Sequence, residues 1–128
     1  MNLLLDTHTA LWWVNEHEKL SSKAKSLLLN DAHTLYISIV STWEIAIKVS
    51  LGKMIGLKDG VKTFLTKLEE MPVYLLPVSP RHVEAVEKLP FIHRDPFDRL
   101  LIATAKTDNM SILTADENIY KYDVSYLW

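Results

Sequence analysis

Four acidic side chains stand where a folded α/β chain could bring them together, and Asp6 and Asp116 follow predicted strands. Asp6 comes directly after the apolar run NLLL, and Asp116, in ILTADEN, comes two residues after the β-like segment 111–114. Because the carboxyl ends of parallel strands meet at one edge of a sheet, both aspartates are expected at that edge. Capping of a helix or a turn is the alternative role for each.

Glu44 lies within a predicted helix, on the same stripe as Val40, Ile47 and Leu51. Its carboxylate is therefore predicted to face inward. An i,i+4 pair with Lys48 is the alternative, but such a pair contributes only about 0.2–0.5 kcal/mol. Desolvation of a charge costs several kcal/mol, so the pattern favours a wet, metal-bearing pocket beside Glu44.

The stretch HRDPFDRLLIATA, residues 93 to 105, supplies the remaining acid. Asp95 before Pro96 has the form of an N-cap followed by proline at the first helical position. Asp98 falls on the stripe of Leu101 and Ile102 and lies near the positive end of the helix, which favours an anion. Asp98 is therefore the preferred site acid in this stretch, and Asp95 is the alternate.

Polar residues adjoin these acids. Thr7, Ser38 and Thr114 are expected to cap helices or to bond strand ends, and orientation of a ligand or a water is the alternative. Arg94 and Arg99 are expected to pair with Asp95 or to lie in solvent. Contact of one of these arginines with a phosphate is the second possibility.

Convergence of the four acids at one edge would favour a cation, because mutual repulsion raises carboxylate pKa values and destabilises an empty site. An all-oxygen ligand set suits a hard ion, so Mg²⁺ is expected and Mn²⁺ is the alternative. Such an ion, or a pair of ions, activates water and neutralises charge on a phosphodiester during in-line attack. The acids therefore predict metal-assisted hydrolysis.

The predicted elements alternate between strand and helix, which is typical of a three-layer α/β sandwich with a mostly parallel central sheet of four to five strands flanked by helices. Residues 1–128 are expected to form a single domain. The expected strands are 2–5, 35–38, 73–76, 111–114 and 124–127. The expected helices are 7–14, 22–30, 40–51, 59–70, 80–88 and 96–108.

Composition excludes several classes of protein. Fourteen Lys and Arg against sixteen Asp and Glu give a formal charge of −2, so no broad basic surface for nucleic acid is expected. The absence of cysteine excludes disulfides and cysteine-ligated metals. No apolar run reaches the ~20 residues of a membrane span, so a cytoplasmic protein without membrane contact is expected.

The quoted acids stand in segments that resemble a known family. The segments LLLDTHTALWW, ISIVSTWEIAIKVSLGK, HRDPFDRLLIATA and ILTADENIYKYDVSYLW together cover nearly the whole chain. In order and context they resemble the PIN-domain ribonucleases, and more closely the VapC-like toxins of bacterial and archaeal type II toxin–antitoxin systems. The resemblance implies a single PIN-like domain, with Asp6, Glu44, Asp98 and Asp116 as the first to fourth metal-site and catalytic acids.

The same resemblance implies an activity and partners. It implies an Mg²⁺-dependent endoribonuclease that cuts cellular RNA and blocks translation. It also implies a homodimer, and a cognate antitoxin protein with a segment that fills the acidic groove.

Two other classes of protein are alternatives. A receiver-type Mg²⁺-binding signalling domain has similar length and alternation, but it needs two acids after the first strand and an aspartate after a middle strand. Here Asp6 stands alone and Ser38 ends the second strand. A non-catalytic PIN-like module that binds RNA or protein is the other alternative, although four acids suit a polyanion binder poorly.

Overall fold

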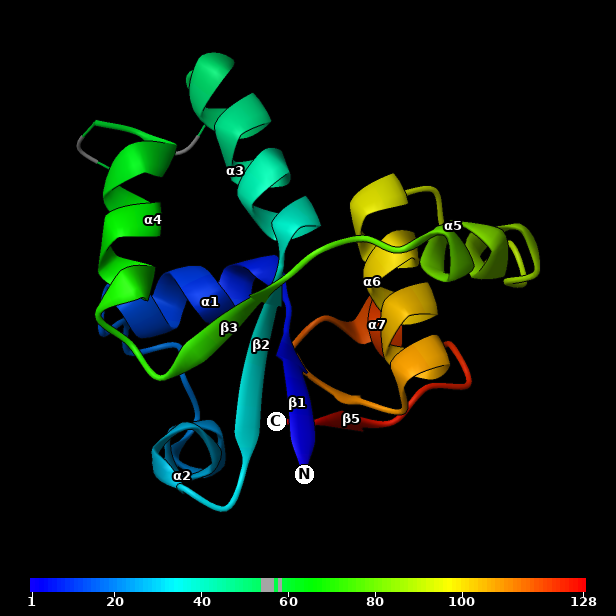
Figure 1. Cartoon of the computed structure of the whole chain (residues 1–128), viewed down its shortest axis with the longest axis horizontal. Helices are drawn as coiled ribbons and strands as arrows, with labels where there is room; N and C mark the ends of the chain where they lie inside the picture. Colours follow the sequence, from blue (N-terminus) through cyan, green and yellow to red (C-terminus); the bar gives the residue numbers. More distant parts are fainter. Residues whose placement is uncertain (54–56, 58) are drawn as a thin grey trace.

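A parallel sheet forms the centre of the molecule (Figure 1). The computed structural model describes residues 1–53, 57 and 59–128. In these residues five strands form one sheet in the order β3-β2-β1-β4-β5, with every neighbouring pair parallel. The strands are β1 (Asn2–Leu5), β2 (Thr34–Ser38), β3 (Val73–Leu76), β4 (Ser111–Leu113) and β5 (Tyr126–Leu127). The predicted three-layer α/β fold is confirmed.

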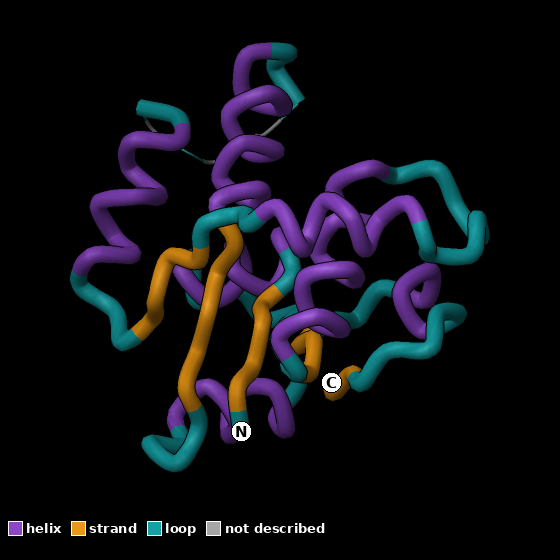
Figure 2. The backbone as a smooth tube through the Cα atoms, turned by 45° about the vertical axis from the view of Figure 1, so that its right-hand side comes forward, coloured by secondary structure: helices purple, strands orange, loops and turns teal. Residues whose placement is uncertain are grey.

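Helices cover both faces of the sheet (Figure 2). Those in the described residues are α1 (Thr7–Val14), α2 (Ser22–Leu29), α3 (Ile39–Ser50), α4 (Val61–Glu69), α5 (Pro80–Glu87), α6 (Pro96–Asp108) and α7 (Glu117–Tyr120). Helices α1 to α4 contribute to one apolar cluster, whereas α5 to α7 contribute to the other. The four-residue helix α7 was not expected from the sequence.

The central strand β1 is buried on both faces. Leu3 and Leu5 pack into the cluster of α1 to α4, and Leu4 packs into the cluster of α5 to α7. Side chains alternate between the faces of a strand, so a strand with helices on both sides must be apolar at every inward position. This requirement accounts for the unbroken run of leucines that predicted the strand.

The strand order sets the place of the site. From β1 the chain proceeds to β2 and β3 on one side, and later returns to β4 and β5 on the other. Ligands of open α/β sheets bind beyond the carboxyl ends of the strands at such a change of direction. The end of β1 and the end of β4 flank this position.

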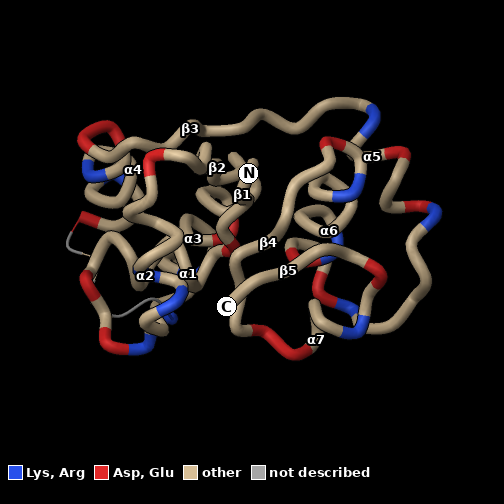
Figure 3. The backbone as a smooth tube through the Cα atoms, turned by 90° about the horizontal axis from the view of Figure 1, so that it is seen from below, with Lys and Arg blue, Asp and Glu red and all other residues tan. Residues whose placement is uncertain are grey.

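Charge lies outside the sheet. The strand sequences contain no Asp, Glu, Lys or Arg, and Figure 3 shows the charged residues in the helices and loops around them. Acidic and basic residues are interspersed on both sides. In the described residues, no helix combines the length and the apolar character needed to cross a bilayer.

One predicted burial was wrong. The stripe of α3 was expected to continue to Leu51, but Leu51 is 61 % exposed. Val40 and Glu44, in the first half of the helix, are buried. The helix runs outward from the sheet (Figure 1), and Leu51, at its C-cap, lies beyond the core.

Candidate active site

Asp6 and Asp116 are linked through Thr114 at the carboxyl ends of β1 and β4. Asp6 is the N-cap of α1, and its Oδ1 accepts a hydrogen bond of 2.7 Å from the Thr9 backbone N–H. Its Oδ2 accepts a hydrogen bond from the Thr114 hydroxyl. The Thr114 oxygen in turn accepts from the Asp116 backbone N–H at 3.0 Å. Thr114 thus fixes the second oxygen of Asp6 and the start of the segment that carries Asp116.

Asp116 is itself a helix cap. Its Oδ1 accepts from the Asn118 backbone N–H at 2.9 Å, at the start of α7. The expected capping roles of Asp6 and Asp116 are therefore both present. Capping occupies one oxygen of each carboxylate, and this use is compatible with a second role for the other oxygen.

Glu44 is buried beside Asp6, at 3 % exposure. Thr7, the residue after Asp6, donates its hydroxyl proton to Glu44 Oε1 at 2.7 Å. Lys48 Nζ lies 2.6 Å from Glu44 Oε2. Glu44 faces inward, as predicted. The ion pair with Lys48, which was the alternative role for Glu44, is also present. The Thr7 bond connects the start of α1 to α3.

Asp98 lies in the first turn of α6. Burial, together with the negative charges of Asp95, Asp116 and Glu44, raises the pKa of Asp98 from 3.8 to about 7. A hydrogen bond from His93, with Nε2 at 3.1 Å from Asp98 Oδ2, acts in the opposite direction. Charge repulsion among these acids means that they share one electrostatic environment.

Asp95 has a different position. Its Oδ1 accepts from the backbone N–H groups of Phe97 at 2.9 Å and Asp98 at 3.0 Å. Asp95 is thus the N-cap of α6, and Pro96 is the first helical residue. These bonds match the cap that the sequence predicts, whereas Asp98 is the acid whose pKa is raised by the charges of Asp116 and Glu44.

Asp6 is more deeply buried than Asp98. Burial raises the pKa of Asp6 above 3.8, although hydrogen bonds from Thr114 and Thr9 oppose the rise. Two of the four acids thus have carboxyl groups whose charge is disfavoured by their surroundings. Perturbed pKa values of this kind are typical of functional sites and favour entry of a cation.

The expectation for Arg99 was wrong. Arg99 is buried, and its Nη1 donates to the Pro90 carbonyl at 2.9 Å and to the Tyr122 hydroxyl at 3.0 Å. Its guanidinium also lies 4.8 Å from the centre of the Phe91 ring. Arg99 therefore neither pairs with Asp95 nor reaches solvent, because it is held by the loop that precedes α6.

Ser38 is a structural cap. Its hydroxyl accepts from the Val40 backbone N–H at 3.1 Å at the start of α3. The residue is buried at the carboxyl end of β2. Ser38 thus sets the direction in which α3 leaves the sheet and carries Glu44.

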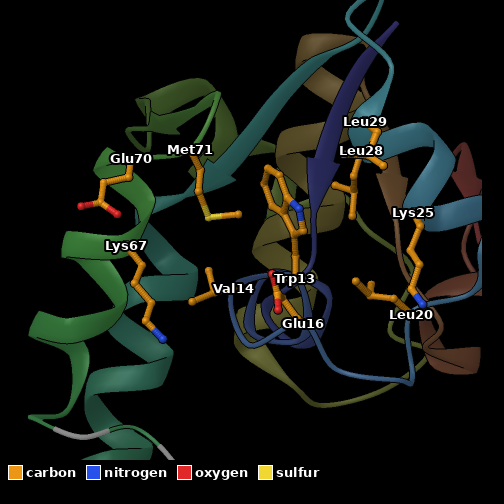
Figure 4. A pocket seen from close by; sticks show the side chains of 10 residues that line it. All are labelled: Trp13, Val14, Glu16, Leu20, Lys25, Leu28, Leu29, Lys67, Glu70 and Met71. Atoms are coloured by element: carbon orange, nitrogen blue, oxygen red, sulfur yellow. The ribbon is translucent and has the colours of Figure 1, made fainter.

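A pocket of about 280 Å³ borders Asp6 and Asp116. His8, Trp12 and Lys19 also line it. A larger pocket, of about 640 Å³, lies among α1, α2 and α4, and both apolar side chains such as Trp13 and charged side chains such as Glu16 line it (Figure 4). None of the four acids lines the larger pocket, so size does not identify the site here.

Comparison with known proteins places the chain in a family. The model of the PIN domain matches residues 3–125. The chain belongs to the PIN-domain family. This PIN domain is 31% identical over 118 residues to Ribonuclease VapC22 of Mycobacterium tuberculosis, a match that covers 91% of this chain and 88% of the relative.

Solved structures share the fold. VapBC2 from Rickettsia felis, bound to a DNA fragment from the promoter, matches with a TM-score of 0.74 and 17% identity over 100% of this chain and 99% of that chain. VapBC-1 from nontypeable Haemophilus influenzae matches with a TM-score of 0.68 and 16% identity over 99% and 97%. These likenesses confirm the PIN fold.

Sequence reasoning missed two contacts of this PIN domain. His93 and Tyr122 were assigned no role, yet His93 binds Asp98 and Tyr122 binds His93. Lys48 was considered only as an alternative to a metal pocket. The position of His93 in the turn before α6 was a usable signal, but Tyr122 lies 29 residues further along and only the fold brings it near.

The PIN-domain acids have the chemistry of a hard-cation site without forming a closed ligand cluster. Among the described residues, no group of three or more His, Asp or Glu side chains is placed to hold a metal ion. Glu44 is paired with Lys48, and Asp98 with His93. The oxygen donors and the raised pKa values of Asp6 and Asp98 fit a divalent cation.

Proposed function

We propose that this PIN domain is a metal-dependent endoribonuclease and the toxin of a type II toxin–antitoxin pair. The proposal is supported by Asp6 and Asp116, which follow the neighbouring parallel strands β1 and β4, and by Asp98, whose pKa is raised by burial and by the charges of Asp116 and Glu44. The 31% identity to a protein named as a ribonuclease supports it. Residues 1–128 are proposed to act as one PIN-like domain.

The four acids are the proposed ligands of Mg²⁺, with Mn²⁺ as the alternative ion. When bound, such an ion lowers the pKa of a coordinated water and neutralises negative charge on the phosphodiester. Thr114 and Thr7 orient Asp6 and Glu44 for this role through the hydrogen bonds described above. Without the cation, Asp98 is partly protonated near neutral pH because its pKa is raised to about 7, and this lowers the repulsion among the acids.

The proposed path of the RNA follows the pocket beside Asp6 and Asp116. Lys19, on the wall of this pocket, is exposed and offers positive charge to a phosphate. The Trp12 ring lies 5.6 Å from Lys19 Nζ and offers a surface on which a base can stack. Local positive charge of this kind, together with a divalent ion, allows a chain of charge −2 to hold a polyanion.

Two protein partners form part of the proposal. A cognate antitoxin is supported by the likeness of the fold to the VapBC pairs of Rickettsia felis and Haemophilus influenzae. A segment of this antitoxin would fill the acidic groove and exclude RNA. The family resemblance also supports a homodimer, which light scattering of the purified chain will measure.

The proposal is tested by incubating antitoxin-free protein with a pool of structured RNAs in Mg²⁺, Mn²⁺ or EDTA. Cleavage in either metal and none in EDTA is the expected result. Binding of the same RNAs without cleavage, by protein that is folded and loaded with metal, would contradict the enzyme and indicate a non-catalytic RNA-binding module.

A further inference from the structure

A chain of hydrogen bonds lies behind Asp98. His93 Nε2 lies 3.1 Å from Asp98 Oδ2, and His93 Nδ1 lies 2.8 Å from the Tyr122 hydroxyl oxygen. Arg99 Nη1 donates to the same hydroxyl oxygen at 3.0 Å. Arg99 and Tyr122 are buried, and the side chains of His93 and Asp98 are only 14% and 16% exposed. Little water therefore competes with these bonds.

The donors and acceptors in this series of hydrogen bonds determine which nitrogen of the His93 ring carries the proton. The Tyr122 oxygen accepts from Arg99 Nη1 and also from the His93 backbone N–H at 3.3 Å. A phenolic oxygen has two lone pairs and one proton, so the proton remains for His93 Nδ1, which must then be an acceptor. A neutral imidazole whose Nδ1 accepts carries its proton on Nε2. His93 thus donates to Asp98.

Further contacts hold the side chains of this hydrogen-bonded series in place. Arg99 is anchored to the Pro90 carbonyl at 2.9 Å and lies over the Phe91 ring. The Tyr122 ring meets the His93 ring edge-on, with centroids 5.4 Å apart and an interplanar angle of 67°. Such contacts restrict rotation of the imidazole about its own axis. The loop before α6, α6 itself and the segment after α7 together set the direction of the Nε2–H bond.

We propose that His93, fixed in its Nε2–H tautomer by Tyr122 and Arg99, is a positioning residue that orients the Asp98 carboxylate for the divalent cation. The bond to Nε2 occupies Asp98 Oδ2 and leaves Oδ1 to the shared acidic site. The link to a cation and to RNA cleavage rests on the proposed function. The tautomer of His93 follows from the hydrogen bonds alone.

The tautomer is measured first, in metal-free protein labelled with ¹⁵N-histidine. Two-bond proton–nitrogen correlations distinguish Nε2–H from Nδ1–H, and the His93 signals are identified by their loss in His93→Gln. The wild type is expected to have the Nε2–H form, and Tyr122→Phe is expected to give a mixture or the other tautomer. Tyr126→Phe, which changes an exposed tyrosine, is the matched control and should leave the signals unchanged. An Nδ1–H wild type would overturn the proposal.

Metal binding is measured next, by calorimetric titration with Mn²⁺. His93→Leu should weaken Mn²⁺ binding about 10-fold or more, as expected when a hydrogen-bond partner of a ligand is lost. His93→Gln keeps an N–H donor near the position of Nε2, so its affinity should stay within about threefold of the wild type. Circular dichroism establishes that both variants are folded, and the RNA-cleavage rates should follow the same order.

The outcomes separate the two proposals. Equal Mn²⁺ affinity in His93→Leu and wild type, or equal losses in folded His93→Leu and His93→Gln, would refute the positioning role while leaving the nuclease intact. A wild type that binds Mn²⁺ but cuts no RNA refutes the nuclease and leaves the positioning of Asp98 standing. A wild type that binds no Mn²⁺ overturns the positioning role together with the metal-dependent function.

Discussion

Lys48 Nζ lies 2.6 Å from Glu44 Oε2, one turn further along α3. The Glu44 side chain is 5% exposed, whereas that of Lys48 is 33% exposed. The ammonium thus neutralises a buried carboxylate from the solvent side. A cation bound by Glu44 would share this carboxylate with Lys48.

The first prediction concerns Lys48→Met. Loss of the ammonium leaves the Glu44 charge without its partner, so the free energy of unfolding in EDTA should fall by about 1–3 kcal/mol. Addition of Mg²⁺ should stabilise the variant more than the wild type, because the ion replaces the missing charge. Urea unfolding with and without Mg²⁺ measures both effects. Lys106→Met, at an exposed position on α6, is the control. Equal gains from Mg²⁺ in wild type and Lys48→Met would argue against a cation at Glu44.

The second prediction separates the two aspartates of α6. Asp98→Asn and Asp95→Asn each remove one negative charge, and asparagine preserves the N-cap at position 95. Asp98→Asn should lower the RNA-cleavage rate more than about 100-fold, and Asp95→Asn less than about fivefold. Cleavage rates at saturating Mg²⁺ measure the difference. The reverse order would identify Asp95 as the site acid.

The third prediction concerns pH. The pKa of Asp98 is raised from 3.8 to about 7, so the metal-free folded state binds a proton that the unfolded state has released between these values. The free energy of unfolding in EDTA should therefore fall as the pH rises through this window. In Asp98→Asn the fall should be smaller by roughly 1–3 kcal/mol between pH 5 and pH 8.

Asp31→Asn, which removes an exposed carboxylate, is the control for the pH measurement. It should retain the pH dependence of the wild type. An equally steep fall in Asp98→Asn would show that the proton is bound elsewhere in the folded protein.

The fourth prediction concerns Thr114→Val. The hydroxyl donates to Asp6 and accepts from the Asp116 N–H, so its loss should misplace both acids and lower cleavage about 10–100-fold. Thr104→Val removes a buried hydroxyl that only bonds the Leu100 carbonyl within α6, and serves as the matched control. Loss of activity in proportion to loss of stability in both variants would indicate that Thr114 has no special role.

Much of the fold followed from local pattern. The leucines of β1 and the Asp95-Pro96 start of α6 each have a local cause, so these elements were predicted close to their observed bounds. The short helix α7 was missed because four residues give no periodicity. Leu51 was misplaced because a helical stripe does not reveal where a helix leaves the core.

The site could be predicted only in part. Because β1 and β4 are parallel, Asp6 and Asp116 lie at the same edge of the sheet, whichever residues their side chains contact. The sequence therefore suffices to predict that these two aspartates share an edge. The partners of Arg99 and His93 depend on Tyr122, which reaches them from beyond α7. Contacts across such separations are set by tertiary packing, and no spacing in the sequence encodes them.

The four acids are proposed to hold a divalent ion on which RNA cleavage depends. Asp6→Asn is the substitution of choice, because asparagine keeps the oxygen that caps α1, removes the negative charge and replaces the Oδ2 that accepts from Thr114 with an amide nitrogen. Mn²⁺ affinity and RNA-cleavage rate are measured on the same preparation, alongside the wild type. We predict folded protein with Mn²⁺ binding at least about tenfold weaker and cleavage more than about 100-fold slower. Wild-type affinity and wild-type cleavage in Asp6→Asn would contradict the account.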